Sequence, residues 1–136
     1  MPNLINRYKK EEDGATAVEF ALISVGFITI VMAIVEMSFA VWTINSLDYA
    51  VAKAGRHASI NSGATTNEIE TIVNQELEEH YIPSETTSYN ITNVTRGGVN
   101  FVDITATMNY EPKSTAIIPG TWSFSITRTT VNPVYP

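Results

Sequence analysis

The residues with the clearest potential for chemistry lie near the N-terminus, at Gly14, Ala15 and Glu19. A carboxylate near the start of a membrane segment costs about 2.5 kcal/mol or more on insertion scales, so Glu19 either lies in the headgroup region or requires a partner. Cleavage between Gly14 and Ala15 would create an α-ammonium four residues before Glu19, on the same face of a helix. Proteolysis would therefore supply the counter-ion, within one chain or from a neighbouring subunit.

Glu19 belongs to a long apolar segment. Residues 15–47 hold most of the apolar side chains, and residues 20–35 carry no charge. A helix over residues 15–44 spans about 45 Å, more than the ~30 Å hydrocarbon thickness of a bilayer. A secretory signal peptide has an apolar region of only about 7–15 residues, so we expect a membrane-crossing helix at about residues 20–44. Hydropathy alone leaves a plain single-pass anchor open.

Basic residues flank the apolar segment on both sides. Arg7, Lys9 and Lys10 precede it, and Lys53 and Arg56 follow it. The excess of positive charge before the segment favours a cytoplasmic N-terminus.

Glu36 is the second acid of the apolar segment. At ~100° per residue it lies about a quarter turn away from Glu19, so the two acids do not share a face. We therefore expect no carboxylate pair for acid/base catalysis. Glu36 either tunes the stem near the membrane interface or pairs with Lys53 or Arg56 of a neighbouring copy.

Small residues continue the helix past the membrane. Ala50, Ala54 and Ala58 recur every four residues until the sequence Asn-Ser-Gly at positions 61–63 ends the helix. Small residues at this spacing let neighbouring stems approach closely, the same stripe could lie on the chain's own domain, and both could hold in one molecule. Gly55 within this run predicts a flexible point or a kink.

These motifs together resemble a known family. Residues 14–20, GATAVEF, resemble the prepilin peptidase site of type IV pilin-like proteins, with Gly before the cut and Glu at the fifth mature position. AVEFAL at residues 17–22, Glu36 and AVAKAGRHAS at residues 50–59 resemble the TadE-like minor pilins, or pseudopilins, of Tad (Flp) tight-adherence pili.

The resemblance implies a processing route. A prepilin peptidase would cleave between Gly14 and Ala15, and Glu19 would pair with an N-terminal amine during assembly. An intramembrane aspartic peptidase binds the scissile bond extended and close to its catalytic carboxylates, and Gly14 has no Cβ to obstruct that approach.

The region after the stem contains a second helical pattern. Residues 67–80 place Ile69, Ile72, Val73 and Leu77 on one stripe. Asn67 is the predicted N-cap and Pro83 the predicted stop. We expect the acidic residues of this helix to form a solvated surface: Glu68, Glu76, Glu78 and Glu79.

Residues 89–95, 99–110 and 122–131 are rich in Thr, Val and aromatic residues and predict three strands. The sequence Arg-Gly-Gly at positions 96–98 predicts a turn between the first two. A change of apolar parity near Phe101 predicts a β-bulge or bend. A sheet this small needs a cover, so we expect a three-stranded antiparallel sheet packed on the long helix, and an α+β fold.

Composition excludes several functions. The net charge is −6, without a basic cluster beyond the leader, so nucleic acid is disfavoured as a partner. Cysteine is absent, and His57 and His80 each lack a second ligand at metal-binding spacing. We expect no catalytic residues, no metal and no cofactor, and hence no enzyme.

We therefore predict a leader at residues 1–14, a hydrophobic stem helix at residues 15–60 and a small exported α+β domain at residues 61–136. The resemblance implies a structural minor pilin that takes part in assembly of a Tad/Flp-type pilus from the bacterial inner membrane. Its implied partners are major and minor pilin subunits, the prepilin peptidase, the assembly machinery and the lipid bilayer. The alternative is an unprocessed, single-pass membrane-anchored binding module on the cell envelope.

Overall fold

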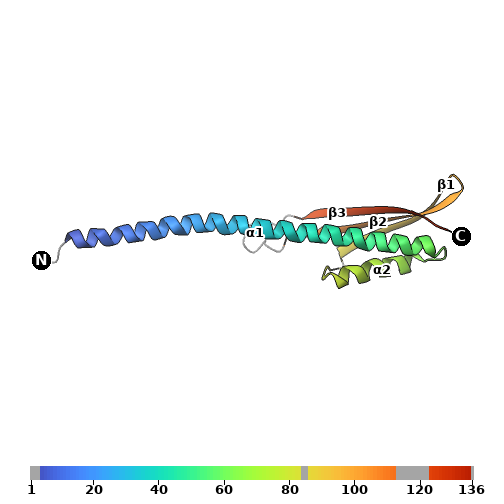
Figure 1. Cartoon of the computed structure of the whole chain (residues 1–136), viewed down its shortest axis with the longest axis horizontal. Coiled ribbons are helices and arrows are strands. Elements are labelled where there is room, and N and C mark those ends of the chain that lie inside the picture. The colour runs from blue at the N-terminus through green and yellow to red at the C-terminus, as the bar shows by residue number, and fades with distance from the viewer. Residues whose placement is uncertain (1–3, 84–85, 113–122, 136) are drawn as a thin grey trace. The chain divides into compact units, whose positions relative to one another are not determined.

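The computed structural model describes residues 4–83, 86–112 and 123–135, with side chains from Gly14 onward. The chain folds into two helices followed by three strands (Figure 1). Their bounds are α1 Leu4–Ile60, α2 Thr66–Glu79, β1 Thr87–Arg96, β2 Val99–Tyr110 and β3 Phe124–Pro133. The chain divides into two compact units, Met1–Met37 and Ser38–Pro136.

The first unit is helical over its described residues. Its described residues 4–37 contain no proline, and from Val18 onward most of the large apolar side chains are exposed. The stretch Gly14–Ile60 is long and apolar enough to cross a membrane, and its most apolar window is not buried within the chain. A helix that is apolar all round is normally covered by lipid or protein, so this part of α1 requires an environment that its own chain does not provide.

The second unit is an α+β domain with its own core. The strands form an antiparallel sheet in the order β1-β2-β3, packed on the C-terminal part of α1 and on α2. The core draws on both helices and on alternate residues of β2. It comprises Leu47, Ala50, Val51, Ala54, Ala58, Ile69, Val73, Leu77, Ile82, Val102, Ile104, Ala106, Met108, Tyr110 and Ile126. The predicted fold class and sheet are confirmed.

Gly55 does not interrupt α1, which continues to Ile60, so the predicted flexible point is replaced by a packing role. A Cβ at Gly55 would overlap the side chain of Asn132 and lie 3.0 Å from Cγ2 of Thr130. Glycine therefore permits β3 to approach the helix closely. Close approach of the Asn132 and Thr130 side chains is a reason for glycine that helix propensity cannot reveal.

The start of α2 corrects the predicted cap. The N-cap is Thr65, whose hydroxyl accepts a hydrogen bond from the Glu68 amide at 3.3 Å. Asn67 instead lies within the first turn, where its carbonyl accepts a hydrogen bond from Thr71 at 2.7 Å. Thr65 is the N-cap because its side-chain oxygen accepts from the Glu68 amide, which has no partner within the first turn of the helix.

The end of α2 is set by a backbone motif rather than by Pro83. The amide of Ile82 donates to the carbonyl of Leu77 at 2.9 Å, and the amide of Tyr81 donates to Glu78 at 3.0 Å. Tyr81 takes a positive φ of 58°. These features define a Schellman motif in which a tyrosine occupies the left-handed position that glycine usually fills.

The hairpin between β1 and β2 turns at Gly97 and Gly98, whose φ angles are 62° and 82°. The register then runs without a break from Arg96↔Val99 to Thr87↔Met108, so the predicted bulge near Phe101 is wrong. Phe101 simply faces outward, where the Arg96 guanidinium lies 5.9 Å from its ring centre. The apolar Phe101 lies on the outer face of β2 beside Arg96, so the alternation of apolar residues seemed to change face although the strand does not. The predicted start of the third strand at residue 122 lies outside the described residues.

Candidate functional site

Gly14, Ala15 and Glu19 all lie on exposed turns of α1, and residues 1–3 of the predicted leader lie outside the described residues. The bond between Gly14 and Ala15 is therefore helical before any cleavage. A Cβ at Gly14 would meet nothing within 4 Å. The chain's own fold does not need glycine here, and glycine weakens a helix by about 1 kcal/mol relative to alanine. Any requirement for glycine at position 14 would therefore come from a partner outside the chain. Glycine also makes local unwinding of the helix around the Gly14–Ala15 bond easier.

Glu19 stands one turn after Ala15 on this helix. Its side chain is exposed among apolar neighbours such as Val18 and Phe20. None of the ion pairs between described side chains involves Glu19. The helical geometry thus places the α-nitrogen of residue 15 on the face of Glu19, as the spacing predicts.

Glu36 differs from Glu19 because it is buried, with 8% of its surface exposed. The neighbouring Val35 and Met37 are exposed. Its predicted pairing with Lys53 or Arg56 of another copy remains a prediction. Lys53 already has a partner in its own chain, Glu76.

Ala50 and Ala54 are fully buried in the core of their own chain. Of the two alternatives for the alanine stripe, the structure places these side chains against the domain rather than at the surface. Close packing of this part of α1 on the sheet uses the small residues, because bulkier side chains would hold the layers apart.

The structure joins α1 to α2 through two polar contacts that sequence reasoning missed. Lys53 forms an ion pair with Glu76, and His57 Nε2 lies 2.9 Å from Glu68 Oε1. Glu76 is only 4% exposed, which corrects the prediction that it belongs to a solvated face. The hydrogen bond to Glu76 raises the pKa of Lys53 above its ordinary value. The helical period contained the signal, because Glu76 lies on the buried stripe with Ile69, Val73 and Leu77.

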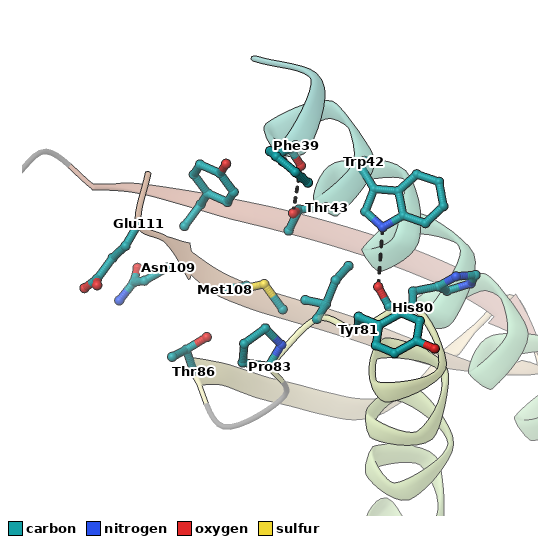
Figure 2. A pocket seen from close by; sticks show the side chains of 12 residues that line it. Phe39, Trp42, Thr43, His80, Tyr81, Pro83, Thr86, Met108, Asn109 and Glu111 are labelled. Carbon is teal, nitrogen blue, oxygen red and sulfur yellow. Dashed lines mark hydrogen bonds between the residues drawn. The ribbon is translucent and has the colours of Figure 1, made fainter. Parts of the chain in front are cut away.

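An open pocket of about 460 Å³ lies in the second unit, and no sequence pattern predicted it (Figure 2). Trp42 and Tyr81 line it, with Met108 from the sheet. The indole nitrogen of Trp42 donates to the His80 carbonyl at 3.4 Å, and the His80 ring meets the rings of Trp42 and Tyr49 edge-on. The lining is largely aromatic and apolar, which suits an apolar ligand rather than a reaction.

Among the described residues, no group of three or more His, Asp or Glu side chains is placed to hold a metal ion. His57 and His80 are engaged in separate contacts on different parts of the domain.

The long N-terminal hydrophobic helix, with its exposed acid after Gly14, is the element that a known family matches. Residues 14–56 match the family TadE, described as TadE-like protein, so this part of the chain is a TadE-like domain. The matched region begins at Gly14 and includes Glu19, Glu36, Ala50 and Ala54. No match is found among curated proteins or among solved structures.

Proposed function

We propose that this chain is a structural minor pilin, or pseudopilin, of a Tad/Flp-type adherence pilus, made as a precursor and cut after Gly14. One observation carries the proposal. Within the TadE-like region, the most apolar window of the helix is not buried in its own chain, and the helix bears an exposed acid one turn after the proposed new N-terminus.

The mechanism follows from the environment of the stem. In lipid, apolar side chains gain little by exchanging lipid for one another, so helices associate through close packing and specific polar contacts. Cleavage would provide such a contact, because it creates an ammonium at Ala15 for Glu19 of the same chain or of a neighbour. Opposite charges attract far more strongly in a low-dielectric medium than in water. Removal of the leader and creation of the counter-charge are then a single event, which restricts assembly to processed chains.

The proposed path of membrane insertion, export and assembly implies a set of partners. The chain inserts once into the bacterial cytoplasmic membrane, exports the domain after the stem, and meets the prepilin peptidase and the pilus assembly machinery there. It then packs against major and minor pilin subunits, and the exported domain reaches the pilus or the cell surface.

The test is the N-terminus of the full chain extracted from its native membrane. Intact mass and N-terminal sequencing should show a protein that begins at Ala15. The substitution Gly14→Leu should leave the full-length precursor, because a side chain at this position obstructs the peptidase. Gly26→Leu is the matched control, since a Cβ at Gly26 also meets nothing within 4 Å.

The outcomes separate the two hypotheses. A wild-type protein that begins at Met1 or Pro2 would support the unprocessed membrane-anchored binding module instead. Normal maturation of Gly14→Leu would remove the prepilin peptidase from the proposal, and a block in Gly26→Leu as well would point to a general insertion defect.

A further inference from the structure

The aromatic pocket lies at the end of the second unit where α1 enters it (Figure 2). Phe39 and Trp42, from the first turns of α1 within this unit, form part of the wall. α2 ends at the same level, because the indole nitrogen of Trp42 donates to the carbonyl of His80, the residue after α2. The end of β2 contributes Met108 and Tyr110. The pocket is thus built where the domain begins along α1.

This level of α1 coincides with the expected outer boundary of the membrane. A helix rises about 1.5 Å per residue, so about 20 residues cross a hydrocarbon core of ~30 Å. The charge-free run of the membrane-crossing stretch begins at Phe20, and a count of about 20 residues from there ends at Phe39. Glu36, the one acid within that count, is buried and does not face the lipid. The pocket therefore opens where hydrocarbon meets headgroups.

The side chains around the opening are of the kind that lie at membrane interfaces. Trp and Tyr are enriched there because each combines an apolar ring with one polar group. Phe39, Trp42 and Tyr81 have 49%, 54% and 93% of their surface exposed. Three large rings at one opening require a cover that the described part of the chain does not supply.

Tyr81 is held at this opening by an unfavourable backbone conformation. Its φ of 58° lies in the left-handed region, where glycine is the usual residue and other residues are less stable. Its ring gains little packing within the chain, because almost all of its surface is exposed. Strained residues persist mainly at sites that serve a function. A partner outside the chain supplies a reason for tyrosine that its own fold does not.

We propose that this pocket holds the acyl chain of a zwitterionic phospholipid from the membrane that α1 crosses, and so seats the domain on the bilayer surface. The cavity of about 460 Å³ has the size of a small-molecule site and a largely apolar lining, which a hydrocarbon chain requires. Continuity favours lipid over a protein partner, because the wall belongs to the same helix whose preceding turns lie in lipid. The inference rests on the membrane insertion in the proposed function, and not on cleavage or filament assembly.

Charge selects the class of lipid. The described charged residues near the opening are acids, namely Glu111 in the lining and Glu78 and Glu79 in the last turn of α2. These carboxylates repel an anionic headgroup and favour one whose ammonium group offsets its phosphate. Phosphatidylcholine and phosphatidylethanolamine have such headgroups.

The chain has no cysteine, so a single cysteine can carry a nitroxide spin label. We would label Tyr81→Cys and, as the matched control, Tyr135→Cys, since both tyrosines are exposed. The Tyr135 amide donates to the Ser59 carbonyl, so the control lies about 25 Å further along α1 than Trp42. The labelled full chains are reconstituted into phosphatidylcholine vesicles.

The spin label reports which medium surrounds each position. Oxygen concentrates in hydrocarbon, whereas a nickel chelate present on both sides of the membrane stays in water. At position 81 the label should collide more with oxygen than with the chelate, and at position 135 the order should be reversed. Equal access of the chelate to both positions would show that the domain stands clear of the bilayer, and would overturn the proposal.

A second measurement tests whether the pocket itself retains lipid. The full chain is released from mixed vesicles of phosphatidylcholine and phosphatidylglycerol, and native mass spectrometry identifies the lipid that stays bound. The wild type should retain phosphatidylcholine. Tyr81→Gly should lower the apparent affinity about tenfold, which corresponds to about 1.4 kcal/mol, and Tyr135→Gly should leave it unchanged. Glycine suits the backbone at position 81, so this loss would not be a loss of fold.

Three results would contradict the inference. Equal retention by Tyr81→Gly and the wild type would place the lipid elsewhere. A preference for phosphatidylglycerol would exclude the zwitterionic class. A different polypeptide cross-linked to the Tyr81→Cys chain in native membranes would make a protein the occupant.

The Gly14→Leu chain separates this inference from the proposed function. It should retain lipid whether or not the leader is removed, because the pocket lies in the second unit. Loss of lipid contact in a chain that matures normally would overturn this inference alone. An uncleaved wild-type chain that retains lipid would overturn only the proposed processing.

Discussion

Under the proposed function, Glu19 pairs with the α-ammonium that cleavage creates at Ala15. An acid at this depth is costly in lipid, and its position one turn after Ala15 matches it to the amine that cleavage would release. The neutral isostere glutamine removes the charge and keeps the shape.

We expect Glu19→Gln to mature normally, since it leaves Gly14 and Ala15 intact, and to co-purify with other pilin subunits about tenfold less, as expected for loss of about 1.4 kcal/mol. The measurement combines intact mass with quantitative recovery of detergent-extracted complexes. Glu19→Asp keeps the charge and should recover part of the association. Full association of Glu19→Gln would contradict the charge pair.

Tyr81 occupies a backbone conformation that costs an ordinary residue about 1–2 kcal/mol. Its side chain is 93% exposed, so packing within the chain contributes little to offset that cost. Glycine suits the position better, although it also adds entropy to the unfolded chain.

Tyr81→Gly should raise the free energy of unfolding of the domain by about 0.5–1 kcal/mol. Tyr81→Val should lower it, because a β-branched residue is least suited to positive φ. Thermal unfolding of the full chain in detergent checks both signs. A less stable Tyr81→Gly variant would show that the tyrosine ring makes a stabilising contact at the pocket.

The elements of the second unit are held by contacts between distant segments of sequence. α1 meets β3 at Gly55 and Asn132, and it meets α2 at Lys53 and Glu76. These contacts explain two residues whose types are unfavourable by local rules, a glycine inside a helix and an acid on a buried stripe.

Gly55→Ala tests the contact between α1 and β3. Alanine normally stabilises a helix interior by about 1 kcal/mol relative to glycine. Here the new methyl group overlaps Asn132, so we expect a net loss of about 1–2 kcal/mol in the free energy of unfolding. Urea unfolding of the full chain in detergent is the measurement.

Asn132→Ala in the Gly55→Ala chain should recover most of the loss, because the two sites are in contact and their effects are not additive. Gly63→Ala is the control, since a Cβ at Gly63 meets nothing within 4 Å. If Gly55→Ala is more stable than the wild type, β3 can move away from the helix without cost.

At the scale of the whole molecule, the two units differ in what they need. The second unit buries apolar residues from helices and sheet in one core. The first unit leaves its apolar side chains uncovered in the chain itself. The stem therefore depends on surroundings that its own chain does not provide, which agrees with the proposed function.

Local patterns in the sequence were sufficient for the elements and their type. The charge-free run, the alternating strands and the glycine pair at the hairpin depend on residues close in sequence, so they predicted α1, the sheet and the turn at Gly97 and Gly98. The candidate site of Gly14, Ala15 and Glu19 was visible for the same reason, because helical spacing alone relates its members.

Only the tertiary structure decided which residues face each other across elements. Glu76 is buried because α2 lies along α1, Gly55 lies against the Asn132 side chain because β3 passes close to it, and Ala50 and Ala54 face their own core. The pocket beside Trp42 arises in the same way. Such features depend on contacts between segments far apart in the chain, and no local periodicity encodes the distance between them.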